Sequence, residues 1–308
     1  MKKITDYSKV FNTLIERTED YIRNNNLTCM VLGISGGIDS TVVAAICHEV
    51  SRRTGIPLIG RSLPTKHNKE GEITTADLVG KAFCTDYKEV NIQKWYYDSW
   101  YFNEHGSDYS AIAAGNIQAR LRMIYLYNIA SINKGIVMDT DNLTENNLGY
   151  FTIHGDVGDF NPIGGLWKTE VFALASYIKD YYSFEAKLHS NPSLIEASSN
   201  KATAVEESLK LKPTAGLGIT DSDLDEIGAD SYEQVDYILQ EILAWKEFKL
   251  KHGFYASSHE ITCDDFLEDQ QMLDTPYPII EAVAKRHFAS EFKRKQLPIK
   301  ISRNEIVL

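Results

Sequence analysis

Residues Met30–Ala45 read MVLGISGGIDSTVVAA. An apolar run leads into a glycine-rich turn, and a second apolar run with helical spacing follows it. This order is typical of a buried strand that connects tightly to a helix. The turn, Ser35–Ser40, would place successive backbone N–H groups at the start of that helix, where anions bind. The stretch therefore predicts an α/β fold with a phosphate site at the end of its first strand.

The turn also fits the nucleophile-elbow pattern G-x-S-x-G, with Ser35 as the nucleophile. Such an elbow normally follows several strands and has no use for Asp39 and Ser40. The turn is not a Walker loop either, because the required Lys is missing. Phosphate binding is the favoured interpretation, and a plain strand–helix turn is the alternative. The glycines allow a close approach to the anion, and Asp39 is suited to hold Mg²⁺.

Apolar runs typical of strands alternate with helical patterns along most of the chain. The strands are expected at Thr28–Ile34, Pro57–Leu63, Lys88–Ile92 and Gly135–Asp139, and the helices at 5–24, Ser40–Arg53, Glu70–Phe83, Ile112–Asn133 and Leu166–Tyr182. This order predicts a three-layer α/β fold with a doubly wound parallel sheet. The patterns in Tyr232–Leu250 and Pro278–Lys295 predict a helical C-terminal part.

The whole chain, 1–308, is expected to form one domain with three parts. An ATP-binding α/β core would span about 25–190, and a helical part would span about 232–308. Between them, Leu211–Ser231 is rich in Gly, Asp and Ser and weakly periodic. A loop of this length is typical of a lid or of disorder. We expect a mobile lid at about 206–231.

Composition excludes several classes of function. The 308 residues carry a net charge of −11, which disfavours a nucleic-acid-binding surface. No run reaches the length of a membrane span, and the charged N-terminus does not resemble a signal peptide. The four cysteines are scattered without a C-x-x-C pair, which predicts reduced thiols and a cytoplasmic protein.

Ser35–Ser40 resembles the S-G-G-x-D-S pyrophosphate loop of the N-type ATP pyrophosphatases. Five further segments, in order and spacing, are similar to segments of NAD synthetase: SLP (Ser62–Pro64), GNIQARLRM (Gly115–Met123), TDNLTENNLGYFTIHGD (Thr140–Asp156), KPTAGL (Lys212–Leu217) and KRHFASEFKRKQLP (Lys285–Pro298). The resemblance covers nearly the whole chain. It implies an adenine nucleotide alpha-hydrolase-like, Rossmann-like fold. It also implies ATP-dependent adenylation of deamido-NAD, followed by attack of ammonia to give NAD, AMP and pyrophosphate.

The resemblance also implies roles for individual residues. Asp39, Glu145 and Lys168 would be catalytic, and Asp39 and Glu145 would hold Mg²⁺. ATP, as cosubstrate, would contact Gly33, Ile34, Ser35, Gly36, Gly37, Ile38, Asp39, Ser40, Thr140, Lys168 and Thr214. For Glu145 alone the alternative is a solvated loop carboxylate, and for Lys168 it is an exposed charge near a helix start. A cation at that position is unfavourable unless an anion accompanies it.

The expected deamido-NAD contacts are less regular. They are Arg120, His154, Asp159, Phe292 and Lys293. Arg122 competes with Arg120 for its role, and Asp159 matches only after a one-residue gap. Two positions depart from the family pattern: Ile153 stands where many members have Lys, and Phe292 stands where many have His. His154 is a candidate replacement for the missing Lys.

The resemblance implies a homodimer with small-molecule substrates. The long helix with Arg120 and the aromatic run Trp95–Phe102 are the candidate contact surfaces. The chain has no room for a glutaminase domain beside the synthetase, so the expected nitrogen donor is free ammonia or ammonia from a separate protein. The alternatives are another amidating or tRNA-modifying ATP pyrophosphatase, and a nucleotide-binding regulatory protein without catalysis.

Overall fold

The computed structural model describes residues 3–99, 110–214, 222–269, 275–295 and 298–306. Its main sheet has four parallel strands in the order β3-β2-β1-β4: β1 (Met30–Gly33), β2 (Leu58–Ser62), β3 (Asp86–Glu89) and β4 (Ile136–Val137). Met30 pairs with Leu58 on one side and with Ile136 on the other. A bridge from Met138 to Phe160 connects this sheet to a parallel pair, β5 (Phe160–Asn161) and β6 (Ile299–Lys300). The predicted parallel sheet is confirmed.

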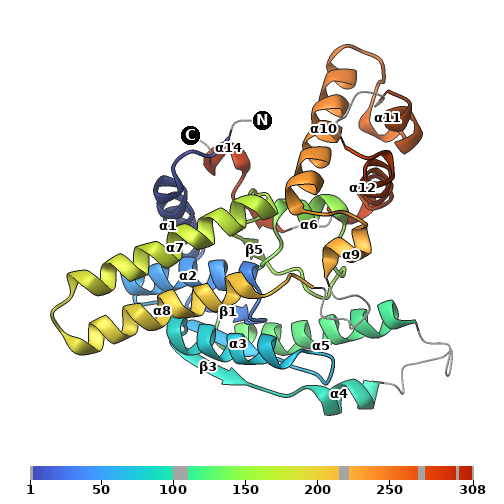
Figure 1. Cartoon of the computed structure of the whole chain (residues 1–308). Helices are drawn as coiled ribbons and strands as arrows, with labels where there is room; N and C mark the ends of the chain where they lie inside the picture. The colour runs from blue at the N-terminus through green and yellow to red at the C-terminus, as the bar shows by residue number, and fades with distance from the viewer. Residues whose placement is uncertain (1–2, 100–109, 215–221, 270–274, 296–297, 307–308) are drawn as a thin grey trace.

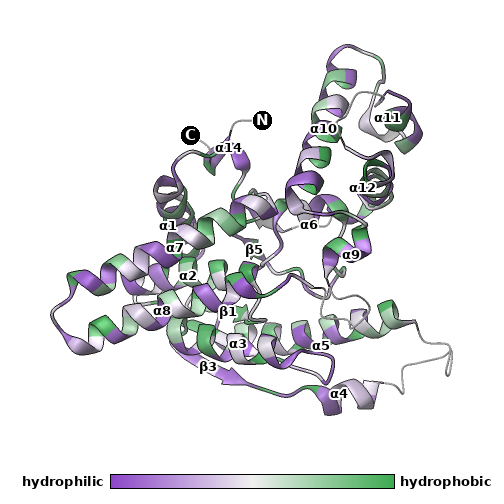
Figure 2. Ribbon diagram, viewed as in Figure 1, coloured by the Kyte–Doolittle hydropathy of each residue, from purple (hydrophilic) through white to green (hydrophobic). Residues whose placement is uncertain are grey.

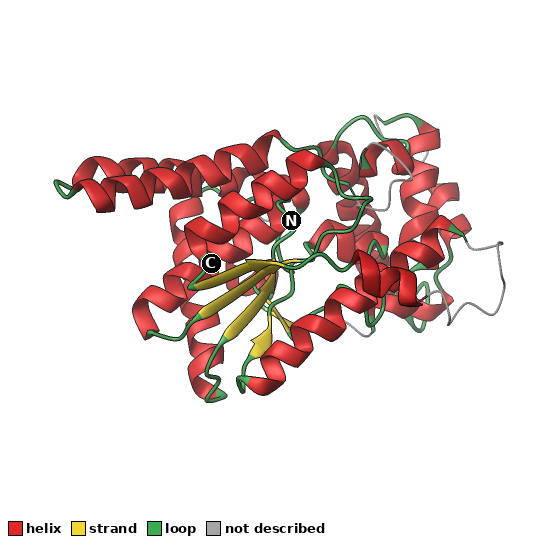
Figure 3. Ribbon diagram, turned by 90° about the horizontal axis from the view of Figure 1, so that it is seen from below, coloured by secondary structure: helices red, strands yellow, loops and turns green. Residues whose placement is uncertain are grey.

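Helices cover both faces of the sheet, as Figure 3 shows. One face carries α1 (Tyr7–Asn24), α2 (Ile38–Thr54), α3 (Glu70–Phe83), α7 (Lys168–Leu188) and α8 (Pro192–Lys210). The other face carries α5 (Ala111–Ile132), on which α4 (Gln93–Asp98) packs. Met30 and Leu32 belong to the first core and Val31 to the second. Because β1 is buried on both faces, its residues are apolar without alternation.

The edge strand β3 differs in composition from the inner strands. It reads DYKE, and Lys88 and Glu89 are exposed. Figure 2 shows this edge as hydrophilic. Charged side chains on an edge strand disfavour pairing with a further strand. The composition therefore ends the sheet at β3.

The C-terminal helices form a second lobe beside the sheet (Figure 1). It contains α9 (Asp223–Ile227), α10 (Tyr232–Lys251), η2 (Ser258–Glu260), α11 (Cys263–Asp269), α12 (Tyr277–Ala289) and α13 (Glu291–Arg294). Its core includes Val235, Ile238, Phe266 and Val283. The lobe packs on α6 (Leu143–Leu148), and α14 (Arg303–Ile306) returns to α1. The predicted helical C-terminal part is present.

Three expectations are corrected in detail. The third strand is Asp86–Glu89 rather than Lys88–Ile92, because Ile92 precedes α4 and fills the second core. The pattern Pro278–Lys295 is broken at Ser290 into two helices, α12 and α13. The expected lid, 206–231, begins inside α8, which runs to Lys210, and includes α9.

Parts of two expected features, at 100–102 and 215–221, lie outside the described residues. None of the helices in the described ranges is long and apolar enough to cross a membrane. All four cysteines are free, and Cys29 and Cys47 are buried. The absence of disulfides agrees with the reduced thiols expected from the sequence.

Candidate active site

A pocket opens at the carboxyl ends of the central strands, between the sheet and the C-terminal lobe. The chain leaves β1 toward β2 on one side, and β4 lies on the other side. Such a switch point is where open α/β sheets bind ligands. Its walls include the glycine turn, the segment after β2, the start of α5 and the segments after β4 and α8. The sheet topology thus brings the predicted turn to the expected edge.

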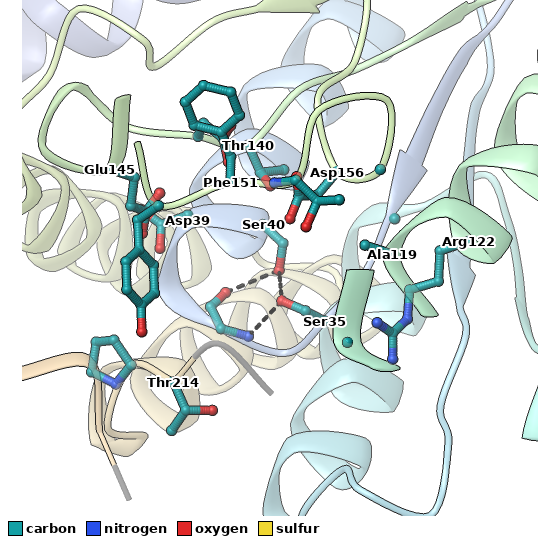
Figure 4. A pocket seen from close by; sticks show the side chains of 18 of the residues that line it. Ser35, Asp39, Ser40, Ala119, Arg122, Thr140, Glu145, Phe151, Asp156 and Thr214 are labelled. Carbon is teal, nitrogen blue, oxygen red and sulfur yellow. Dashed lines mark hydrogen bonds between the residues drawn. The ribbon is translucent and has the colours of Figure 1, made fainter. Parts of the chain in front are cut away.

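The glycine turn is held in one conformation by its contacts. Gly36 has a φ of +85°, and a Cβ there would lie 2.4 Å from the carbonyl oxygen of Glu72. Ser40 Oγ donates to the Gly37 carbonyl at 3.0 Å and lies 3.0 Å from Ser35 Oγ, as Figure 4 shows. Gly37 caps α2 without a side chain, so the first N–H groups of this helix are available to an anion.

The pocket does not support the nucleophile-elbow interpretation. An elbow serine needs a histidine base within hydrogen-bond distance. No histidine is present among the described residues that line the pocket. Ser35 Oγ instead accepts from the Gly37 N–H at 3.2 Å. The hydroxyl of Ser35 therefore stabilises the turn through its bonds to Gly37 and Ser40.

The three predicted catalytic residues meet beside the turn. The Lys168 Nζ donates to Asp39 Oδ2 at 2.5 Å and to Glu145 Oε1 at 2.9 Å. The Lys168 side chain is only 2% exposed. Asn142 Nδ2 donates to the second Asp39 oxygen at 2.9 Å. The structure therefore gives Lys168 a buried, paired position in place of the exposed-charge alternative.

Local sequence explains where Glu145 points. It is the third residue of α6, and Asn142 is the N-cap of that helix. The Asn142 N–H donates to Glu145 Oε2 at 3.1 Å, while the Glu145 N–H donates to Asn142 Oδ1 at 3.0 Å. This reciprocal capping box leaves Oε1 for Lys168. The solvated-loop alternative for Glu145 does not hold, because its side chain is 19% exposed and bonded at both oxygens.

Burial and pairing set the charges in this cluster. Burial raises the pKa of Glu145 to about 7, although the Lys168 ammonium opposes the shift and Asp39 adds to it. Burial alone would lower the pKa of Lys168, but Asp39 and Glu145 outweigh it and raise that pKa well above its usual value. Lys168 therefore stays cationic over the physiological range.

The cluster also fits a divalent cation. Two carboxylates, from Asp39 and Glu145, converge on one cation, the Lys168 ammonium. Mg²⁺ is typically held by one or two protein carboxylates together with phosphate oxygens and water. The donor set beside the glycine turn is of this kind, so these two residues would hold the ion.

A second acidic group was not assigned from the sequence. Thr140 lines the pocket, and the buried residues Asp139 and Asp141 lie on either side of it in the chain. Asp141 Oδ2 has no hydrogen-bond partner among the described residues. Burial, reinforced by Asp139 and Asp156, raises the pKa of Asp141 well above its usual value. The signal was available in the sequence, since two acidic residues, Asp139 and Asp141, end or directly follow the expected fourth strand.

The predicted dinucleotide contacts separate into two groups. Lys293 lines the pocket and donates to the carbonyls of Gly149 and Phe151, each at 2.7 Å. Phe292 lies outside the set of lining residues and is 59% exposed. His154 is also exposed, with a φ of +58°. The structure thus brings Lys293 to the pocket of this chain but not Phe292 or His154.

The two arginines of α5 point to different places. Arg122 lines the pocket (Figure 4), and its Nε donates to the Leu63 carbonyl at 3.0 Å. Arg120 is exposed, and its Nη2 lies 3.4 Å from the Ile153 carbonyl. Asp159 also lies outside the lining set, where it accepts from the Tyr127 hydroxyl at 2.8 Å. Arg122 is therefore the pocket residue of the competing pair.

The last predicted ATP contact, Thr214, lies on the opposite side of the pocket from Thr140 (Figure 4). Its Oγ1 donates to Glu72 Oε1 at 3.2 Å, which connects the segment after α8 to α3. The pocket is therefore bounded on this side by the start of the expected lid.

A pyrophosphate-loop turn at the first strand of a parallel sheet, next to a buried lysine and two carboxylates, defines the class of ATP pyrophosphatase-like ligases. Within this class the chain belongs to the NAD synthase family, whose model matches residues 10–297. The predicted family resemblance is confirmed, and the chain is accordingly a ligase.

Two relatives show the extent of the similarity. The NH(3)-dependent NAD(+) synthetase of Pyrococcus horikoshii is 34% identical over 308 residues, which cover 99% of each chain. The enzyme of the same name from Campylobacter jejuni is 32% identical over 68% of this chain and 85% of that protein.

Two solved structures are similar to this chain in fold, over different shares of its length. The NMN synthetase of Francisella tularensis matches with a TM-score of 0.67 at 26% identity and covers 94% of this chain and 97% of that one. The NH3-dependent NAD synthetase of Campylobacter jejuni, in complex with nitrate, matches with a TM-score of 0.53 at 27% identity. That match covers 68% of this chain and 99% of the other.

Proposed function

We propose that the pocket catalyses ATP-dependent amidation of deamido-NAD by ammonia, which gives NAD, AMP and pyrophosphate. The observation that carries this assignment is the buried cluster in which Lys168 bridges Asp39 and Glu145 beside the glycine turn. The match to NH(3)-dependent NAD(+) synthetases along the full chain supports the substrate assignment.

The reaction has two bond exchanges. A nicotinate carboxylate oxygen attacks the α-phosphorus of ATP, and the bond from that phosphorus to the bridging oxygen breaks to release pyrophosphate. Ammonia then attacks the acyl carbon, AMP leaves, and the nitrogen loses a proton. Each step brings negative groups together or moves charge onto a leaving phosphate, so fixed positive groups accelerate it.

Different groups around the cluster would have different roles in this reaction. The N–H groups at the start of α2, with Ser35 and Ser40, would bind the departing pyrophosphate. The Lys168 ammonium would neutralise part of its charge. Asp39 and Glu145 would hold Mg²⁺, which would supply further positive charge to stabilise the departing phosphate.

The segment after α8 would limit access of water to the acyl-adenylate. Thr214 already contacts Glu72 at the pocket wall. Exclusion of water protects a reactive intermediate from hydrolysis. We expect the lid to comprise the part of 206–231 that follows α8, whose last residue is Lys210.

A second acyl substrate is favoured by one structural match. The Francisella tularensis structure, an NMN synthetase, covers more of this chain than the Campylobacter NAD synthetase structure does. Phe292 replaces a polar residue of the family pattern and lies outside the pocket. Nicotinate mononucleotide carries the same carboxylate as deamido-NAD but lacks the adenylate half. It is therefore the alternative acceptor in the same chemistry.

The decisive assay supplies ATP, Mg²⁺, ammonium chloride and either acyl substrate. Formation of AMP and NAD from deamido-NAD supports the proposal, and a higher kcat/KM with nicotinate mononucleotide would favour the alternative. Glutamine in place of ammonium should give no turnover. Asp39→Ala should abolish pyrophosphate release, whereas Asp180→Ala, a change at an exposed residue of α7, serves as the matched control.

We also propose a cytoplasmic homodimer that forms through the outer face of α5, with neither nucleic acid nor membrane as a partner. Ile124 and Ile132 on this helix are 67% and 73% exposed, and Tyr127 is 37% exposed. Exposed apolar residues on one helix are typical of a contact surface. Light scattering should give twice the chain mass, and Ile124→Glu should give the monomer.

A further inference from the structure

The two helices that carry Lys168 and Glu145 meet at their N-terminal ends, and a third helix from the C-terminal lobe contacts both. Lys168 is the first residue of α7, and Glu145 is in the first turn of α6. A helix of six residues such as α6 is not stable by itself. Contacts of α10 with α6 and α7 therefore matter for the geometry of the cluster (Figure 1).

One side chain of α10 forms hydrogen bonds with both of these helices. Asp236 is 2% exposed, and its Oδ2 accepts from the Thr169 N–H at 3.0 Å and from the Thr169 hydroxyl at 2.8 Å. Its Oδ1 accepts from the Thr144 hydroxyl. Thr169 directly follows Lys168, and Thr144 directly precedes Glu145. One carboxylate is thus bonded to the chain neighbours of both catalytic residues.

The Thr144 hydroxyl extends the connection to Lys168 itself. Its oxygen accepts from the Lys168 N–H at 2.8 Å while its proton goes to Asp236. The N–H groups of Lys168 and Thr169 have no acceptor within α7, because they belong to its first turn. The carboxylate also lies at the positive end of this helix. Asp236 therefore acts as a cap for α7 that comes from another part of the chain.

We propose that Asp236 is a positioning residue for the adenylation reaction: it fixes the start of α7 and the first turn of α6, so that Lys168 and Glu145 converge on Asp39. Asp236 is not among the residues that line the pocket, so it acts through its neighbours. The inference rests on the proposed function for its catalytic consequence, but its structural part is measurable without substrate.

Hydrogen exchange tests the structural part. In Asp236→Ala, the amides of Lys168 and Thr169 should exchange at least about tenfold faster than in the unaltered chain. Thr144→Val keeps the side-chain shape and should accelerate Lys168 alone, because Thr169 keeps its bond to Asp236. The matched control is Ile242→Ala, which removes buried volume from the same helix without touching this network. Unchanged exchange at both amides in Asp236→Ala would overturn the inference.

Turnover tests the catalytic part. Asp236→Ala should lower kcat for pyrophosphate release by about 10²-fold, because small displacements of catalytic groups are costly. Ile242→Ala, with a comparable loss of melting temperature, should not. In a Lys168→Met background, Asp236→Ala should cause much less further loss, since both changes act on one unit. Equal losses in both backgrounds would overturn the proposal.

A failure of the proposed function and a failure of the positioning role would give different results. If the unaltered chain releases no pyrophosphate with either acyl substrate, the function is wrong while the exchange result still stands. If Asp236→Ala fails to fold, Thr144→Val takes its place in both measurements. A Thr144→Val chain with normal Lys168 exchange and normal kcat would then exclude the positioning role.

Discussion

Lys168 Nζ lies 2.5 Å from Asp39 Oδ2, although 129 positions separate the two residues in the chain. Asp39 is in the first turn of the helix that follows the first strand, whereas Lys168 begins the helix that follows β5. The pair therefore forms only when the sheet is complete. We therefore expect the proposed catalytic cluster to form only when the α/β core is folded.

Lys168→Met should remove activity and also weaken the fold. Without the ammonium, two carboxylates remain partly buried with no counter-charge, which costs roughly 3 kcal/mol of stability. We expect pyrophosphate release to fall by about 10²–10³-fold. Millimolar Mg²⁺ should recover part of the lost stability, because a cation again lies between the carboxylates. Denaturant unfolding with and without Mg²⁺ measures this.

Lys179→Met is the control for this prediction. Lys179 lies on the same helix, and its side chain is 35% exposed beside Asp180. Its stability and turnover should stay near those of the unaltered chain. Normal pyrophosphate release in Lys168→Met would contradict the assigned role.

Stability should decrease as pH rises from about 5 to 8, and Asp141 should contribute to this decrease. Burial raises its pKa well above the usual value near 4, so the folded state binds a proton that the unfolded state has lost. The contribution of Asp141 to the free energy of unfolding is complete at low pH. It is lost as pH rises through the pKa of the folded state, and the loss is at most about 1.4 kcal/mol per pH unit. Asp141→Asn should therefore be relatively more stable at pH 8.

Urea unfolding of both chains at the two pH values tests this sign. Burial also raises the pKa values of Glu145 and Asp139 to about 7. The stability of Asp141→Asn should therefore keep part of its dependence on pH. Asp180→Asn, at an exposed position, should leave the dependence intact. A dependence of the same size in Asp141→Asn would show that Asp141 is ionised in the fold.

Gly36→Ala should destroy the phosphate site by a steric clash. The added Cβ would lie 2.4 Å from the Glu72 carbonyl oxygen and 2.9 Å from the Ala76 nitrogen, both backbone atoms of α3. The turn must then move, and we expect KM for ATP to rise more than about tenfold. Initial rates at varied ATP give the value.

Gly55→Ala separates the clash from backbone strain. Gly55 also has a positive φ, +74°, but a Cβ there meets no atom within 4 Å. Gly55→Ala should lower the free energy of unfolding by about 1–2 kcal/mol, because alanine would adopt a left-handed conformation there. It should leave KM for ATP unchanged. Similar KM values for the two alanine variants would contradict the steric explanation.

The two arginines of α5 should give different kinetic effects. Arg122 holds the segment after β2 through Leu63, so Arg122→Ala should lower kcat/KM about tenfold for ATP and for the acyl substrate alike. Arg120→Ala should raise KM for the acyl substrate alone, if the proposed dimer forms the rest of that site. An effect of Arg120→Ala on KM for ATP would argue against this division.

Much of the fold follows from local pattern. The strand–turn–helix at Met30–Ala45 and the alternation of apolar runs predict the parallel sheet, because a buried strand needs apolar residues on both faces. The capping box of Asn142 and Glu145 is also local. In contrast, the end of β3 and the break at Ser290 depend on packing, which overrides propensity at element boundaries.

By itself, the sequence determined the parallel-sheet core, the glycine turn and the residue types around a phosphate, because these are encoded in short stretches with their own geometry. Only the tertiary structure decided which distant groups meet. It paired Lys168 with Asp39, turned Arg122 rather than Arg120 into the pocket, and joined Asp236 to the start of α7. These contacts depend on how helices pack around one sheet, and the spacing of residues along the chain does not predict that packing.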